Sequence, residues 1–150
     1  EIATLTLLRG LEVPKRLKVD KNFMPCEVSN GDEIFRNGIF HFNISKLISQ
    51  LNSKWLNVAL CEMNVSDFYS AFSKINEDHV GSVDINKPVI LAEIAPSTYN
   101  LVDGNHRVEK ARRAGIKILP CYKLKVYQHL SFLTDKRAYE SYIEYWNSKI

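Results

Sequence analysis

The sequence predicts an α+β fold, with a small mixed sheet, flanking helices and a C-terminal helix. Strand-like apolar segments adjoin one another in some places and alternate with helical patterns in others. The 150 residues suit one domain, so we expect a single domain over residues 1–150. The composition, 45% hydrophobic and 25% charged, is that of a globular protein.

The first elements are short. Residues 1–25 lack a periodic apolar pattern and are interrupted by prolines, which predicts an extended arm. Asn37-Gly38 predicts a tight turn, and residues 38–42 predict a short strand after it. Asn43 is then placed to cap a helix over residues 44–51.

The middle of the chain is predicted to alternate between strand, helix and loop. Residues 57–63 are apolar enough for a buried strand. Ser66 and Asp67 predict the start of a helix, and the polar residues 76–88 predict a loop.

The second half has the clearest patterns. Residues 88–94 predict a strand that forms a hairpin with a second strand beginning at residues 101–102. A helix follows and ends at Gly115, and residues 116–126 predict a third strand. Residues 127–150 predict a helical segment, capped by Thr134 with Asp135.

Charge and cysteine usage narrow the function classes. The net charge of +3 does not by itself indicate nucleic-acid binding. Residues 104–126 nevertheless carry seven basic residues and one acid, which suits an anionic ligand or, alternatively, a solvated helix face. No apolar run has the length of a membrane helix, so no membrane partner is expected. The three cysteines are widely spaced, which favours free thiols and a cytoplasmic location.

The segment Asp103-Gly104-Asn105-His106-Arg107 joins a predicted strand to a predicted helix. The first turn of a helix offers unpaired N–H groups and partial positive charge, and Gly104 allows close approach to an anion. His106 and Arg107 add side-chain donors. Asp103 is placed to bind a metal ion or a hydroxyl group, or to cap the helix. The segment therefore predicts a phosphate site, with a plain turn as the alternative.

Other polar residues nearby have two interpretations each. Arg112 and Arg113 either contact a nucleic-acid backbone or face solvent. Glu93 and Glu109 either act as a general base or form solvated or salt-bridged carboxylates. His79 is expected in a surface loop.

The five-residue turn, the helix ending at Gly115 and the strand opening at Leu119-Pro120 resemble the signature of the ParB/sulfiredoxin superfamily. The resemblance covers residues 85–126. It implies a ParB-like fold and a nucleotide or phosphate bound at the helix start. The contacts would come from Gly104, Asn105, His106, Arg107 and Lys110.

Members of this superfamily differ in function. Sulfiredoxins carry a reactive cysteine where this chain has Asn105, so their chemistry is not expected here. Chromosome-segregation ParB proteins have Glu-Arg where this chain has Asn105-His106, and a helix-turn-helix domain follows. The Asp-Gly-x-His-Arg form resembles stand-alone ParB-like nucleases and ATPases, some encoded by plasmids or phages, and ParB-like small-molecule kinases.

The resemblance therefore implies a phosphohydrolase, a nuclease or an NTPase or both, with Asp103, His106 and Arg107 as catalytic residues. Asp103 would hold a divalent metal such as magnesium, and the nucleotide would be ATP or CTP. One alternative is a nucleotide-gated module that binds DNA or a protein partner without turnover. Another is a small-molecule kinase. Any contact with DNA would be directed at the backbone.

Overall fold

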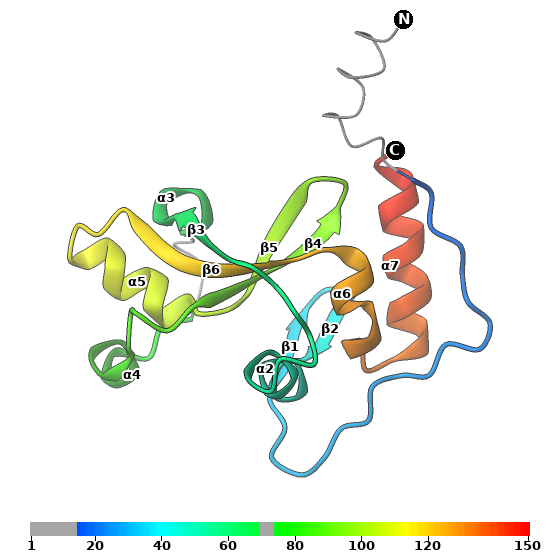
Figure 1. The fold of residues 1–150 in the computed structure, drawn as a ribbon, viewed down its shortest axis with the longest axis horizontal. Coiled ribbons are helices and arrows are strands. Elements are labelled where there is room, and N and C mark those ends of the chain that lie inside the picture. Colours follow the sequence, from blue (N-terminus) through cyan, green and yellow to red (C-terminus); the bar gives the residue numbers. More distant parts are fainter. Residues whose placement is uncertain (1–14, 70–73) are drawn as a thin grey trace, which may run out of the picture.

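The computed structural model describes residues 15–69 and 74–150. Within them lie a two-stranded sheet, β1-β2, and a four-stranded sheet in the order β3-β6-β4-β5 (Figure 1). In the larger sheet β4 and β6 are parallel, while the outer pairs are antiparallel. The fold is therefore a mixed α+β fold, as predicted. The strands are β1 (Ile34–Asn37), β2 (Phe40–Asn43), β3 (Leu60–Asn64), β4 (Val89–Ala95), β5 (Thr98–Asp103) and β6 (Ile118–Leu124).

Helices lie at both ends of the larger sheet, and α2 lies beside the small sheet (Figure 1). Figure 1 shows α3, α4 and α5 gathered at one end and α7 at the other. No helix in the described part of the chain has the length and apolar character that crossing a membrane requires. The helices are α2 (Ile44–Asn52), α3 (Val65–Phe68), α4 (Glu77–Ser82), α5 (Asn105–Arg113), α6 (Val126–His129), the 3-10 turn η1 (Leu130–Phe132) and α7 (Lys136–Ser148).

Strand β4 separates two apolar clusters because alternate side chains of a strand point to opposite faces. Ile90 and Ala92 belong to the cluster that contains α7. Val89 and Leu91 belong to the cluster that contains α5. The predicted hairpin is confirmed, since β4 and β5 pair with Leu91 opposite Leu101.

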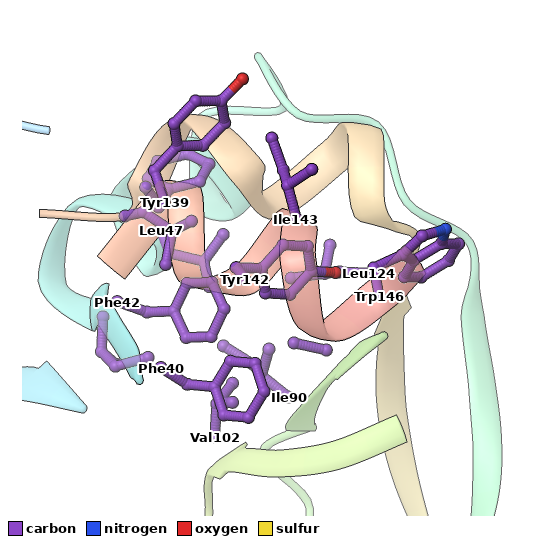
Figure 2. Close-up of a cluster of buried hydrophobic side chains, with 14 residues drawn as sticks. Phe40, Phe42, Leu47, Ile90, Val102, Leu124, Tyr139, Tyr142, Ile143 and Trp146 are labelled. Carbon is purple, nitrogen blue, oxygen red and sulfur yellow. The ribbon is translucent and has the colours of Figure 1, made fainter. Parts of the chain in front are cut away.

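The larger cluster joins the small sheet to α7 (Figure 2). Asn43 caps α2 as predicted, accepting the Lys46 N–H at 3.1 Å. Asp135 caps α7 without Thr134, accepting the Arg137 N–H at 2.7 Å, while the Thr134 hydroxyl donates to the His41 carbonyl at 3.5 Å. Each cap fixes the start of a helix, α2 or α7, whose apolar face packs into this cluster. Its labelled members are Phe40, Phe42, Leu47, Ile90, Val102, Leu124, Tyr139, Tyr142, Ile143 and Trp146.

The predicted arm is extended where the structure describes it, from residue 15, and it follows α7 (Figure 1). Asn147 bonds both backbone groups of Leu17, accepting at 2.8 Å and donating at 2.9 Å. The Trp146 indole donates to the Lys15 carbonyl at 2.8 Å. Phe23 stacks on Tyr139 with ring centroids 3.8 Å apart. Residues 1–14 of the prediction lie outside the described residues.

Two local predictions were wrong. The strand expected over 57–63 begins at Leu60 and is an edge strand rather than a buried one, which leaves Leu60 60% exposed. The loop expected over 76–88 contains α4, because Asn76 caps a short helix by accepting two N–H groups. A helix does begin where Ser66 and Asp67 predict one, and it spans Val65–Phe68.

His129 is a buried histidine in the larger cluster. Its Nε2–H donates to the Glu93 carbonyl at 2.7 Å, and among the described residues Nδ1 has no hydrogen-bond partner. Its ring meets Phe42 edge-on with centroids 5.0 Å apart. Because burial disfavours the charged ring, the pKa of His129 is lowered to about 4.

We expect acidification to destabilise the fold through His129. Between its unfolded pKa of about 6.5 and its folded pKa, the unfolded state binds the proton and the native state does not. Stability is therefore lost as pH falls through this window, by about 2 kcal/mol between pH 7.5 and pH 5. Urea unfolding at both pH values measures the loss. His129→Gln keeps a donor but does not titrate, so its stability should change less with pH. An unchanged slope in that variant would contradict the assignment.

Candidate functional site

The turn between β5 and α5 has a conformation that favours glycine. Gly104 has φ +117°, in the left-handed region. A Cβ at this position would lie 2.5 Å from Val89 Cγ1 and 2.9 Å from Val89 Cβ. We expected this glycine to let the backbone approach an anion. The structure shows that it also lets the turn pack directly against β4.

The turn opens on a cavity of about 400 Å³. All five turn residues, from Asp103 to Arg107, line it. Arg36 of β1, Glu33 just before β1 and His79 of α4 line it too. A second cavity of about 310 Å³ shares Glu33, His79, Asp103 and Arg107 with the first. The structure thus brings the predicted turn to one concave site, together with residues from two distant segments.

The first turn of α5 faces this site with backbone donors. The first helical hydrogen bond runs from the Val108 N–H to the Gly104 carbonyl at 3.0 Å. The N–H groups of Asn105, His106 and Arg107 come before this first bond. The first N–H groups of a helix have no partner within the helix. Gly104 provides no side chain to cap them. An anion in the cavity would meet these donors and the positive end of the helix dipole.

His106 is held between two elements. Its Nε2 accepts the Asn76 N–H at 3.1 Å, so in the neutral ring the proton is on Nδ1. His79 meets it edge-on with ring centroids 4.5 Å apart. Burial, together with the neighbouring His79, lowers the pKa of His106. At neutral pH His106 is therefore an uncharged ring with one donor, and His79 lies beside it on α4 rather than in a loop.

Arg107 is largely internal, with 7% of its surface exposed. Its Nη1 donates to the carbonyls of Lys87 at 3.0 Å and Pro88 at 2.7 Å. Its Nη2 pairs with Asp103 Oδ2 at 2.8 Å. The guanidinium therefore ties the start of β4 to the start of α5. If Asp103 or Arg107 contacts a ligand, the ion pair between them must be shared with the ligand or broken.

The other basic residues of α5 bind elsewhere. Lys110 donates to the Val83 carbonyl at 2.8 Å and so holds the end of α4. Arg113 binds the Glu77 carboxylate with two bonds of 2.7 and 2.8 Å. Arg112 pairs with Glu109 at 2.6 Å. These three side chains, expected at a phosphate or a nucleic acid, instead join α5 to α4 and to Glu109, and none of them lines the cavity at the turn.

The two candidate general bases, Glu93 and Glu109, are both engaged in hydrogen bonds within the protein. The hydrogen bonds from Arg112 and from Arg113 lower the pKa of Glu109 to about 2, so it is a salt-bridged carboxylate. Glu93 is buried rather than solvated. Its Oε2 accepts the Ser97 N–H at 3.0 Å, and its Oε1 accepts the Val126 N–H at 3.2 Å. Neither carboxylate lines the cavity at the turn.

Asp103 Oδ2 pairs with Arg107 at 2.8 Å. The described residues contain no group of three or more His, Cys, Asp or Glu side chains that could hold a metal ion. A divalent cation at Asp103 would therefore share the carboxylate with Arg107 and take its other ligands from water and from a bound phosphate.

Sequence patterns did not single out Glu33 and Arg36 as site residues, because β1 itself had not been predicted. Comparisons of the chain with family models, with curated proteins and with solved structures found no match. The cavity and the turn are therefore the features from which a function can be inferred.

Proposed function

We propose that this chain binds the phosphate group of a nucleotide or of a nucleic-acid backbone in the cavity at the start of α5. The observation that carries the proposal is the joint lining of one cavity of about 400 Å³ by Asp103–Arg107 and by Arg36. That volume lies in the range of small-molecule sites. The resemblance of the turn to the ParB/sulfiredoxin signature supports the same ligand class.

Each part of the site has a role in this proposal. The N–H groups at the start of α5 bind phosphate oxygens, and the neutral His106 donates through Nδ1. Arg36 is exposed and takes part in no ion pair within the described residues. Its guanidinium supplies the charge, because Arg107 is already neutralised by Asp103.

Hydrolysis of the bound phosphate is a second proposal, favoured by the position of Glu33. This residue lines both cavities, is exposed, and takes part in no ion pair of the described residues. Its carboxylate would accept a proton from water while the water oxygen bonds to phosphorus. The bond between phosphorus and the leaving oxygen would break, and His106 with the α5 N–H groups would stabilise the developing charge.

Calorimetry tests binding. Wild-type protein is titrated with ATP, CTP, ADP and a short DNA duplex, with and without magnesium. We expect Arg36→Ala to weaken binding about 10-fold or more, because it removes a charge-assisted hydrogen bond. His106→Ala should weaken it as well. Arg137→Ala removes an exposed arginine from α7, outside the site, and should leave the affinity unchanged.

Two outcomes would overturn the binding proposal: no heat of binding with any of these ligands, or equal affinities for Arg36→Ala and Arg137→Ala. Product analysis of the same samples then addresses hydrolysis. Release of phosphate or of cleaved DNA that Glu33→Gln abolishes, while binding is kept, would support the second proposal. Binding without product would leave a ligand-gated module.

A further inference from the structure

The β3–β6 ladder of the larger sheet holds a pair of cysteines to which no role has been given so far. Cys61 of β3 and Cys121 of β6 are directly opposed in the antiparallel register. Their Sγ atoms are 3.0 Å apart, and the Cys61 thiol also lies 3.4 Å from the Cys121 carbonyl. Directly opposed residues in such a ladder have Cα atoms about 4.5–5.5 Å apart, which falls within the range of disulfides.

The two sulfurs differ in access. Cys121 is fully buried in the cluster beneath α5. Cys61 is half-buried and lies on the edge strand β3. An external disulfide therefore meets Cys61 first, and Cys121 is reached through Cys61.

We propose that Cys61 and Cys121 are a reversible redox site that forms a disulfide by exchange with a low-molecular-weight disulfide of the glutathione class. The site is independent of the phosphate cavity. Cys61 is the residue that reacts first with the external disulfide, and Cys121 is the resolving residue. Cys26, on the arm, is half-buried and stands apart from the pair, with its backbone bonded to Leu133.

The exchange balances in two steps. The Cys61 thiolate bonds to one sulfur of glutathione disulfide, the S–S bond breaks, and one glutathione thiolate leaves. The Cys121 sulfur then bonds to Cys61 Sγ, and the second glutathione leaves as a thiolate that takes up the Cys121 proton. The protein dithiol loses two electrons and two protons, and one glutathione disulfide becomes two glutathione molecules.

The order of attack follows from burial. Burial, together with the contact to Cys61, raises the pKa of Cys121 to about 12, so this sulfur is held as a thiol. It loses its proton only when Cys61 carries a leaving group beside it. Once formed, the bond would join the edge strand β3 covalently to its neighbour β6. Because the cross-link closes a long loop, it should raise the melting temperature by about 10 °C.

The test uses the full reduced chain. It is incubated with glutathione disulfide, quenched by alkylation, and analysed by intact mass and peptide mapping. We expect the wild type to lose two hydrogen atoms and to yield a peptide cross-linked between Cys61 and Cys121. Cys26→Ser should behave like the wild type. Cys121→Ala should stop at one glutathione bound to Cys61, and Cys61→Ala should protect Cys121 from any adduct.

Melting curves in reduced and oxidised buffer accompany the mass data, so a variant that fails to fold is recognised. If Cys121→Ala unfolds, the cross-linked peptide in the wild-type and Cys26→Ser proteins still decides the test. The proposal is overturned if the wild type accumulates only mixed disulfides, or if Cys26 pairs as readily as Cys121. It is also overturned if oxidation leaves the melting temperature unchanged or lowers it. Incubation with excess dithiothreitol should restore the dithiol and the original melting temperature.

Discussion

Replacing Gly104 with alanine is expected to lower the free energy of unfolding by about 3 kcal/mol. The left-handed φ of +117° strains any residue with a Cβ. The new Cβ would also lie 2.5 Å from Val89 Cγ1, on a fully buried strand residue that has little room to shift. Urea unfolding measures the loss. The same variant should lose binding of phosphate ligands, because the start of α5 would be displaced.

Gly115, at the other end of α5, provides the matched control. It also has a positive φ, +72°, but a Cβ there would meet nothing within 4 Å. Gly115→Ala should therefore cost only the backbone term, about 1 kcal/mol. In a Val89→Ala background the loss caused by Gly104→Ala should shrink by about 1 kcal/mol, because the closest methyl is gone. Equal losses for both glycines would show that the contact with Val89 is unimportant.

Replacing Arg107 with alanine is expected to cost about 3 kcal/mol as well. The carbonyls of Lys87 and Pro88 would lose their donor, and Asp103 would lose its counter-charge where its side chain is only 19% exposed. The expected measurement is a lower urea midpoint. If this variant also loses phosphate binding, the loss has two causes. The turn is no longer held in place, and any contact between Arg107 and the ligand is gone.

Arg112→Ala is the control for Arg107, since it removes the same residue type from the same helix. Arg112 is 44% exposed, and Glu109 would keep its pair with Arg113. The expected cost is below about 1 kcal/mol. If Arg107→Ala were as mild, its buried hydrogen bonds would contribute little. A double replacement, Arg107→Met with Asp103→Asn, should recover part of the loss because no buried carboxylate is left unpaired.

The parts of the fold that follow from local chemistry could be predicted from the sequence. The caps at Asn43 and Asp135, the hairpin before the turn and the helix end at Gly115 are each encoded within a few residues. The helical segment predicted in residues 127–150 is also present, and the α7 face with Ala138, Tyr142, Ile143 and Trp146 is buried at helical spacing.

The parts that depend on tertiary contacts could not be predicted. Strand β1 has a burial pattern without alternation, and it forms because β2 pairs with it. Helix α4 is six residues long and is held from outside by Lys110 and Arg113 of α5. The turn was identified as a candidate site, but the sequence could not show that Arg107 points inward. Neither could it show that Arg36 comes from β1.

The contacts of the arm with α7 have a consequence for the order of folding. The two hydrogen bonds between Asn147 and Leu17 join residues 130 positions apart, and the one from Trp146 to Lys15 spans 131. Closing such a loop costs chain entropy before these bonds can repay it, so the sheet and α7 must already be assembled. The arm is then the last segment to attach. If residues 15–25 of the arm detached, Tyr139 and Trp146 would be exposed to solvent while the strands of the sheet stayed paired.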